Sequence, residues 1–180
     1  LDTKADKVIH MNSLDYIYGV VAAEMSPLSE KEALKAQAVA AYTYAVYRRN
    51  YIKENPDKVP EHKGADVCTD SSHCKAYISK EDAKAKWGSK FDEYWSRITE
   101  CVNEVAGKKI TYNKEPIVAV FHSMSAGKTA SAADIWGSEV PYLKSVDSPW
   151  DAENPQFISV NEFTPEEFKK RLADQEGVSF

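Results

Sequence analysis

Residues 29–49 read SEKEALKAQAVAAYTYAVYRR, and this stretch contains the clearest helix signal in the chain. Ser29 and Glu32 predict a capping box at the start of a helix that should run to about Arg49. The interior of this helix is nearly all alanine. Because small side chains on several faces let other backbone elements approach closely, we predict a central helix with neighbours on more than one side.

Shorter elements are expected around this helix. The sequence predicts, in chain order, a helix capped by Asn12 or Ser13 that ends at Pro27, a short helix that starts at Ser79, a helix from Phe91 that stops at Gly107, strands at 110–112 and 117–121, and short helices at 130–134 and after Thr164. Helices come first and mixed short elements follow. This order favours an α+β fold with a helix-rich part and a small mixed β part, which could form two lobes flanking a cleft. We expect a single domain over residues 1–180.

Composition excludes several classes of protein. The 180 residues carry a net charge of −5, with 43% hydrophobic and 28% charged residues, which is typical of a globular protein. The acidic balance argues against nucleic acid as a partner, because lysine and arginine must neutralise phosphates. The apolar stretches are far shorter than the ~18 residues of a membrane helix. Since the chain starts at Leu1, we expect a processed or excised piece.

A long loop after the central helix concentrates cysteine and histidine. His62, Cys68 and Cys74 are evenly spaced, and His73 adjoins Cys74. Thiolate and imidazole are zinc ligands, and tetrahedral zinc needs four. A disulfide between the two cysteines is the alternative, and the spacing leaves both open. Cys101 lies on an apolar helix face and should be a core residue.

Glu24 ends the apolar face of the first helix. A carboxylate that is desolvated on one side suits general acid catalysis, although most glutamates are simply exposed. The loop HSMSAGKT at residues 122–129 follows a strand expected to be buried. Its hydroxyl and amide donors could line a cleft for a hydroxyl-rich ligand such as a glycan. The alternative is an ordinary polar turn.

Several motifs together resemble the stage II sporulation protein D family. The matching stretches are LDYIYGVVAAEM at 14–25, EALKAQAVAA at 32–41, CKAY at 74–77, FHSMSAGKT at 121–129, IWG at 135–137 and YLKSV at 142–146. The resemblance covers residues 12–151. It implies a lytic transglycosylase that cuts the bond between N-acetylmuramic acid and N-acetylglucosamine in peptidoglycan, leaving 1,6-anhydro ends, on strands stripped of stem peptides during engulfment of the forespore.

The resemblance also implies roles for individual residues. Glu24 would be the catalytic residue. The substrate-binding residues would be Lys35, Gln37, Tyr77, His122, Ser123, Ser125 and Thr129. The zinc-binding clostridial members imply a structural zinc ion held by His62, Cys68, His73 and Cys74. This chain departs from the family at three positions, since Tyr42 replaces the usual arginine, Lys75 a frequent glutamine and Ala126 a second glycine.

Partners and location follow from the same resemblance. It implies peptidoglycan glycan strands and the stage II sporulation proteins P (an amidase) and M as partners. It also implies an N-terminal membrane anchor, which this chain would have lost, and an extracytoplasmic place in the septal space between mother cell and forespore. No nucleic acid partner is expected. Two other functions stay open: a zinc-dependent hydrolase, and a non-catalytic wall-binding or scaffold module stabilised by zinc.

Overall fold

The computed structural model describes residues 1–173, and the chain divides into two compact units, residues 1–121 and residues from His122 onward. Helices dominate, and the described strands form one small antiparallel sheet, which confirms the predicted α+β class. The single domain predicted over residues 1–180 would contain both units and stays a prediction. Among the described residues, no helix has the length and apolar character to span a bilayer.

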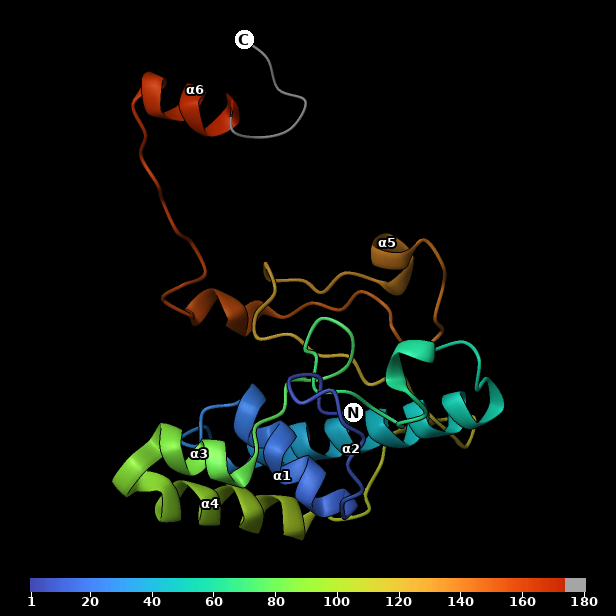
Figure 1. Cartoon of the computed structure of the whole chain (residues 1–180). Helices are drawn as coiled ribbons and strands as arrows, with labels where there is room; N and C mark the ends of the chain where they lie inside the picture. The colour runs from blue at the N-terminus through green and yellow to red at the C-terminus, as the bar shows by residue number, and fades with distance from the viewer. Residues whose placement is uncertain (174–180) are drawn as a thin grey trace. The chain divides into compact units, whose positions relative to one another are not determined.

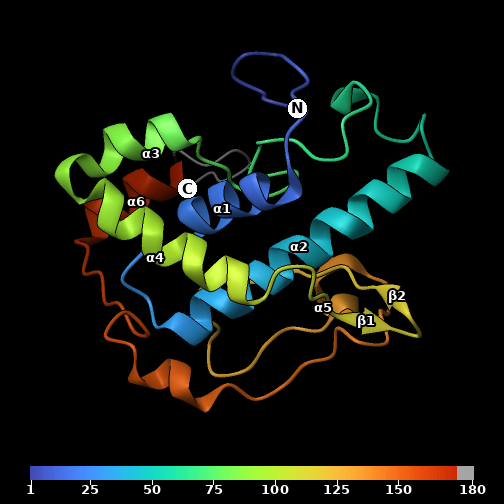
Figure 2. The same ribbon diagram turned by 90° about the horizontal axis from the view of Figure 1, so that it is seen from below.

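Three helices build the core of the first unit. They are α1 (Ser13–Glu24), α2 (Lys31–Glu54) and α4 (Phe91–Glu104), which contact one another pairwise and lie side by side in Figures 1 and 2. Since α2 contacts both other helices, the predicted central helix is confirmed. The buried residues between the helices are Ile17, Val20, Val21, Ala22, Leu34, Ala38, Ala41, Ile98, Cys101 and Val102. Cys101 is therefore a core residue, as expected.

The predicted start and end of α2 are wrong. Glu30 occupies the cap position without a side-chain hydrogen bond, and Glu32 instead accepts a hydrogen bond from Lys35 at 2.8 Å, so there is no capping box with Ser29. The helix also continues past Arg49 to Glu54, because Ile52 extends its buried face, at 8% exposure. By contrast, α1 is capped as predicted, since the Asn12 side chain accepts a hydrogen bond from the Leu14 N–H at 2.8 Å.

The small sheet differs from the predicted strands. Strands β1 (Thr111–Tyr112) and β2 (Glu115–Pro116) pair antiparallel around Asn113 and Lys114, whose φ values are 50° and 71°. Two successive residues with positive φ make a two-residue hairpin turn. The turn is thus shorter than expected, so pairing falls on residues 115–116 and the strand predicted at 117–121 is wrong.

The remaining elements are short. The first unit also contains η1 (Pro60–His62), α3 (Lys80–Trp87) and η2 (Gly88–Lys90), and the second unit contains α5 (Ala132–Trp136), η3 (Pro149–Glu153) and α6 (Pro165–Ala173). Ser79 caps α3 by accepting from the Asp82 N–H at 3.0 Å, as predicted. The helix predicted at 130–134 exists but begins two residues later, after the Ser131 cap. Thr164 and Glu167 form the predicted cap of α6.

Candidate functional site

Glu24 is the last residue of α1, and a backbone amide from another segment holds its side chain. The Ala76 N–H donates to Oε1 of Glu24 at 2.8 Å. Two residues further on, the Ile78 N–H donates to the carbonyl of Gly19 in α1 at 3.2 Å. Across residues 1–173, Oε2 has no hydrogen-bond partner. The carboxyl group is therefore oriented through one oxygen, while the other is available to a ligand.

Gly19 allows this segment to run so close to α1. A Cβ atom at position 19 would lie 2.3 Å from Cε2 of Tyr77 and 2.7 Å from the carbonyl oxygen of Ile78. The Tyr77 ring stacks on Tyr16 of α1, with ring centroids 5.9 Å apart. Pattern reading missed Gly19, although an isolated glycine inside an apolar helix face is itself a signal of close approach.

Lys75 lies next to Ala76 and is half-buried. Its Nζ lies 4.0 Å from the ring centroid of Phe121 and 4.6 Å from that of Tyr44. Burial lowers the pKa of Lys75, and the negative charge of the Glu24 carboxylate opposes this shift. A positive charge therefore stands in the immediate surroundings of Glu24.

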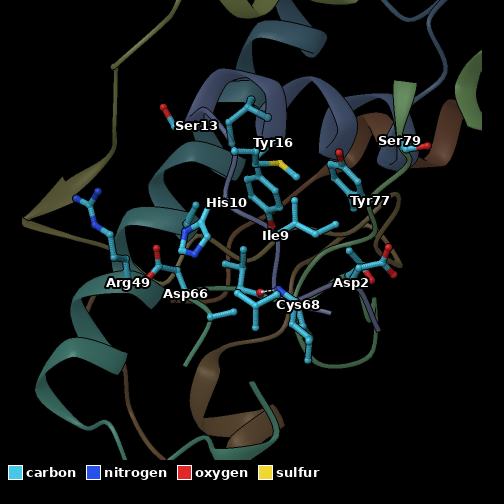
Figure 3. Close-up of a pocket in the computed structure, with 18 of the residues that line it drawn as sticks. Asp2, Ile9, His10, Ser13, Tyr16, Arg49, Asp66, Cys68, Tyr77 and Ser79 are labelled. Atoms are coloured by element: carbon cyan, nitrogen blue, oxygen red, sulfur yellow. Dashed lines mark hydrogen bonds between the residues drawn. The ribbon is translucent and has the colours of Figure 1, made fainter. Parts of the chain in front are cut away.

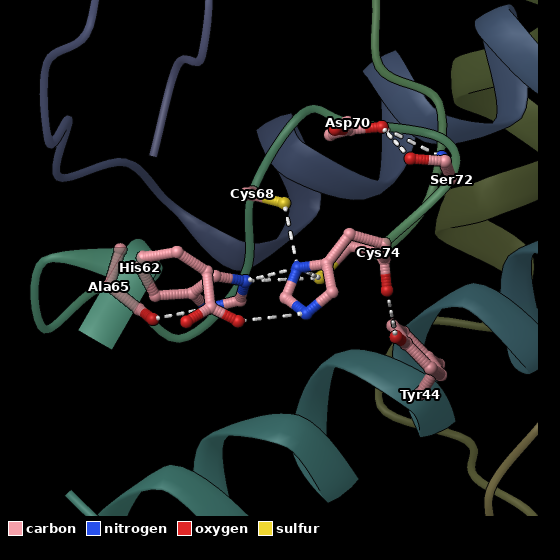
Figure 4. A network of polar contacts seen from close by, with 9 residues as sticks. Tyr44, His62, Ala65, Cys68, Asp70, Ser72 and Cys74 are labelled. Atoms are coloured by element: carbon pink, nitrogen blue, oxygen red, sulfur yellow. Dashed lines mark hydrogen bonds and ion pairs between the residues drawn. The ribbon is translucent and has the colours of Figure 1, made fainter. Parts of the chain in front are cut away.

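The four predicted metal ligands come together in the first unit, as Figure 4 shows with His62, Cys68 and Cys74 labelled. One donor atom from each residue lies within 4.8 Å of the other three. Nε2 of His62 lies 3.0 Å from Nδ1 of His73 and 3.5 Å from Sγ of Cys74, and Sγ of Cys68 lies 3.5 Å from Nδ1 of His73. Both cysteines are free thiols, so the alternative disulfide is not formed.

The donor set, two thiols and two imidazoles, is of the kind that binds tetrahedral zinc. Zinc bound at about 2.3 Å to sulfur and about 2.0 Å to nitrogen holds its ligand atoms roughly 3.3–3.8 Å apart. The two separations of 3.5 Å lie in this range, while His62–His73 at 3.0 Å is shorter and Cys74–His73 at 4.0 Å is longer. The second ring nitrogens also have partners: Nδ1 of His62 lies 3.0 Å from the Ala65 carbonyl oxygen, and Nε2 of His73 lies 3.4 Å from Oε1 of Glu61. Such outer contacts fix the imidazole tautomers of metal-binding histidines. These residues could therefore hold a metal ion.

A separate cavity of about 690 Å³ lies in the same unit and is lined from α1, α2, the N-terminal segment and the cysteine loop (Figure 3). Tyr42, at the position where the family usually has arginine, contributes to its wall. The Tyr16 hydroxyl is buried and has no hydrogen-bond partner among the described residues. Glu24 is not among the residues that line this cavity.

The other predicted substrate-binding residues of the first unit differ in their surroundings. Tyr77 lies beside the Glu24 segment, as described above. Nζ of Lys35 forms ion pairs with Glu104 at 2.5 Å and Glu32 at 2.8 Å, which raise the pKa of Lys35 and tie α2 to α4. Nε2 of Gln37 is buried with no hydrogen-bond partner in the described chain. The substrate-binding roles of all three residues stay predictions.

Two of the four predicted residues in the second unit hold their own loops together. Ser125 donates its backbone N–H and its hydroxyl to Oδ2 of Asp151, and these bonds lower the pKa of Asp151. Oγ1 of Thr129 accepts from the Val146 N–H at 2.9 Å. The remaining two, His122 and Ser123, are exposed. The sequence did not predict the role of Asp151, because a polar turn gives no indication of which distant residue it will bind.

Comparison with known proteins supports one family. The sequence profile of the family described as "Stage II sporulation protein" (SpoIID) matches residues 2–112. The chain is 40% identical over 158 residues to Stage II sporulation protein D of Bacillus subtilis (strain 168), and 40% identical over 161 residues to the protein of that name from Bacillus amyloliquefaciens. These matches cover 88% and 89% of this chain but 45% of each relative, so the chain spans less than half of their length.

A more distant similarity points to a second named protein. The chain is 30% identical over 125 residues to the amidase enhancer of Bacillus subtilis (strain 168), a match that covers 69% of this chain and 14% of that relative. The profile match extends from the N-terminal segment through the helical core to β1, and it includes Glu24, Ala76 and the four Cys/His residues. On these grounds the chain belongs to the stage II sporulation protein D family.

Proposed function

We propose that this chain is the catalytic part of a lytic transglycosylase that cleaves the bond between N-acetylmuramic acid and N-acetylglucosamine in peptidoglycan during sporulation. The observation that carries the proposal is the state of Glu24. Its Oε1 is held by the Ala76 N–H at 2.8 Å, and its Oε2 has no hydrogen-bond partner within residues 1–173. One carboxyl group in this state can serve first as an acid and then as a base.

The proposed reaction needs no other catalytic group. Protonated Glu24 donates its proton to the glycosidic oxygen as the bond from that oxygen to C1 of the muramic residue breaks. The carboxylate then takes the proton of the 6-hydroxyl group of the same muramic residue, and the 6-oxygen bonds to C1. The products are a 1,6-anhydro end and a free 4-hydroxyl, Glu24 is protonated again, and no water is consumed.

Glycoside hydrolysis usually needs two carboxyl groups on opposite sides of the scissile bond. Asp134 and Asp147, the acids nearest to other motifs, both belong to the second unit. Asp134 is engaged in the cap of α5, where it accepts from Ser131. Anhydro-ring formation uses a single carboxyl group, so Glu24 by itself can supply the chemistry that it needs.

We further propose a structural zinc ion bound by His62, Cys68, His73 and Cys74. When bound, zinc would crosslink the cysteine loop and supply no chemistry at the scissile bond. A catalytic zinc ion keeps a coordination position open for water, whereas four protein donors fill a tetrahedral shell. This count disfavours a zinc-dependent hydrolase.

Partners and location are part of the proposal. The chain would act on peptide-stripped glycan strands in the septal space, outside the cytoplasm, as part of a protein anchored in the membrane. The stage II sporulation proteins P and M would act with it. The names of the relatives, two sporulation proteins and an amidase enhancer, support a role in sporulation beside an amidase.

Glu24→Gln tests the reaction, because an amide can hold the Ala76 hydrogen bond but cannot transfer the proton. The purified chain is incubated with peptide-free glycan strands, and the ends are analysed by mass spectrometry. We expect 1,6-anhydro ends from the wild type and from Glu100→Gln, a matched change at an exposed position of α4, and none from Glu24→Gln. Unchanged products from Glu24→Gln would overturn the mechanism. Equal glycan binding by both proteins without any product would support the wall-binding module instead.

A further inference from the structure

Lys75 carries a positive charge that makes no ion pair within the described chain, although the charge of Glu24 acts on it. Its Nζ sits over the rings of Phe121 and Tyr44, at 4.0 Å and 4.6 Å from their centroids. Aromatic faces attract an ammonium group and hold it in place, but they leave its three N–H donors without acceptors. The position of Lys75 is thus fixed while its hydrogen-bonding capacity is unused.

Other lysines of the chain show the contrast. Lys35, Lys63 and Lys90 each place Nζ between 2.5 and 2.9 Å from a carboxylate oxygen. Within residues 1–173, Nζ of Lys75 makes neither an ion pair nor a hydrogen bond. A half-buried ammonium group with no carboxylate in hydrogen-bond contact can still form a charge-assisted hydrogen bond with an incoming anion.

The position of Lys75 in the chain determines which anion can bind to it. It directly precedes Ala76, whose N–H holds Glu24, and the charge of Glu24 acts on it. We propose that Lys75 binds a carboxylate of the substrate beside Glu24, an inference that rests on the proposed function. On the sugar whose bond is cleaved, that carboxylate is the lactyl group of muramic acid.

With this contact, the charge of the lactyl group would determine how tightly a glycan strand binds. In a strand that carries stem peptides, the lactyl carboxyl group is bound as an amide and has no charge. In a peptide-free strand it is a free carboxylate. Lys75 would therefore discriminate between the two kinds of strand through one charge-assisted hydrogen bond, independently of the proton transfers at Glu24.

The test measures binding rather than cleavage, in a Glu24→Gln background that preserves the strands. Three ligands are compared by calorimetry: peptide-free strands, the same strands with the lactyl carboxyl groups converted to primary amides, and strands that carry stem peptides. We expect the first to bind about tenfold more tightly than the other two, which equals ~1.4 kcal/mol. Lys75→Gln should bind all three alike, whereas Lys80→Gln, a matched loss of an exposed charge, should keep the preference.

The outcomes separate this inference from the proposed function. Equal binding of free and amidated strands would overturn it, as would a preference that survives in Lys75→Gln. Tight binding of peptide-bearing strands that is lost in Lys75→Gln would also overturn it, since the contact would then be to peptide carboxylates. If Lys75→Gln does not fold, Lys75→Met, which keeps the aliphatic stem over the rings, replaces it. If the binding test shows discrimination but the protein that retains Glu24 forms no anhydro products, only the proposed reaction is refuted.

Discussion

Gly19→Ala is the sharpest test of how the site is built. The added methyl group would lie 2.3 Å from Cε2 of Tyr77 and 2.7 Å from the backbone oxygen of Ile78. A tyrosine ring can turn aside, but the carbonyl can move only with the segment that also carries Ala76. Overpacking of this kind costs about 1–3 kcal/mol, and alanine recovers ~1 kcal/mol over glycine inside a helix. Because backbone is in the way, we expect a net loss near the upper end, about 2 kcal/mol.

Urea denaturation of the purified chain measures this loss. Ala85→Gly, at an exposed position of α3, gives the helix-propensity difference in the same protein without a packing change. We also expect Gly19→Ala to form anhydro ends more slowly while it is still folded, because the displaced segment no longer presents the Ala76 N–H to Glu24. A Gly19→Ala protein as stable as the wild type, or more stable by the propensity difference alone, would refute the close approach.

Two further predictions concern the metal cluster and the core. We expect about one equivalent of zinc per chain by elemental mass spectrometry. Chelation and Cys68→Ser should each remove the zinc and lower the Tm, whereas Cys101→Ala should retain it. Zinc bound to Cys68→Ser would contradict the ligand set. Thr43, fully buried, donates to the Val39 carbonyl oxygen at 2.6 Å and accepts from the backbone N–H of Ile110 at 2.9 Å. Thr43→Val should therefore cost about 2 kcal/mol in urea denaturation, more than Thr43→Ser, which keeps the hydroxyl; the reverse order would contradict it.

The fold was predictable where local chemistry decides it. The Asn12 and Ser79 caps were confirmed, because an Asx or serine side chain at a helix start has a nearby amide to bind. The Ser29–Glu32 box was wrong because Glu30, not Ser29, occupies the cap position, so Glu32 is not at the third position of the helix. The prediction of a strand at 117–121 was wrong because the hydrophobic pattern does not indicate the positive φ values that shorten the preceding turn.

The site was predictable only through its side chains. Spacing and residue type brought the four Cys/His residues into one hypothesis, and the structure places their donor atoms together. The group that orients Glu24 is a backbone N–H, which any residue except proline carries, so no residue type at position 76 could reveal it. The absence of an ion pair at Lys75 could not be predicted either, because a sequence gives the charge of a residue but not its surroundings.

Three successive residues connect these features. Cys74 belongs to the Cys/His cluster, Lys75 carries a charge that makes no ion pair within the described chain, and Ala76 donates to Glu24. A crosslink at Cys74 limits how far the next two residues can move, because two residues of extended chain span only about 7 Å. A structural metal can thus affect the chemistry through the backbone without contacting the substrate. For the same reason, loss of the metal should impair glycan binding and proton transfer together, whereas Lys75→Gln should impair binding with the metal still in place.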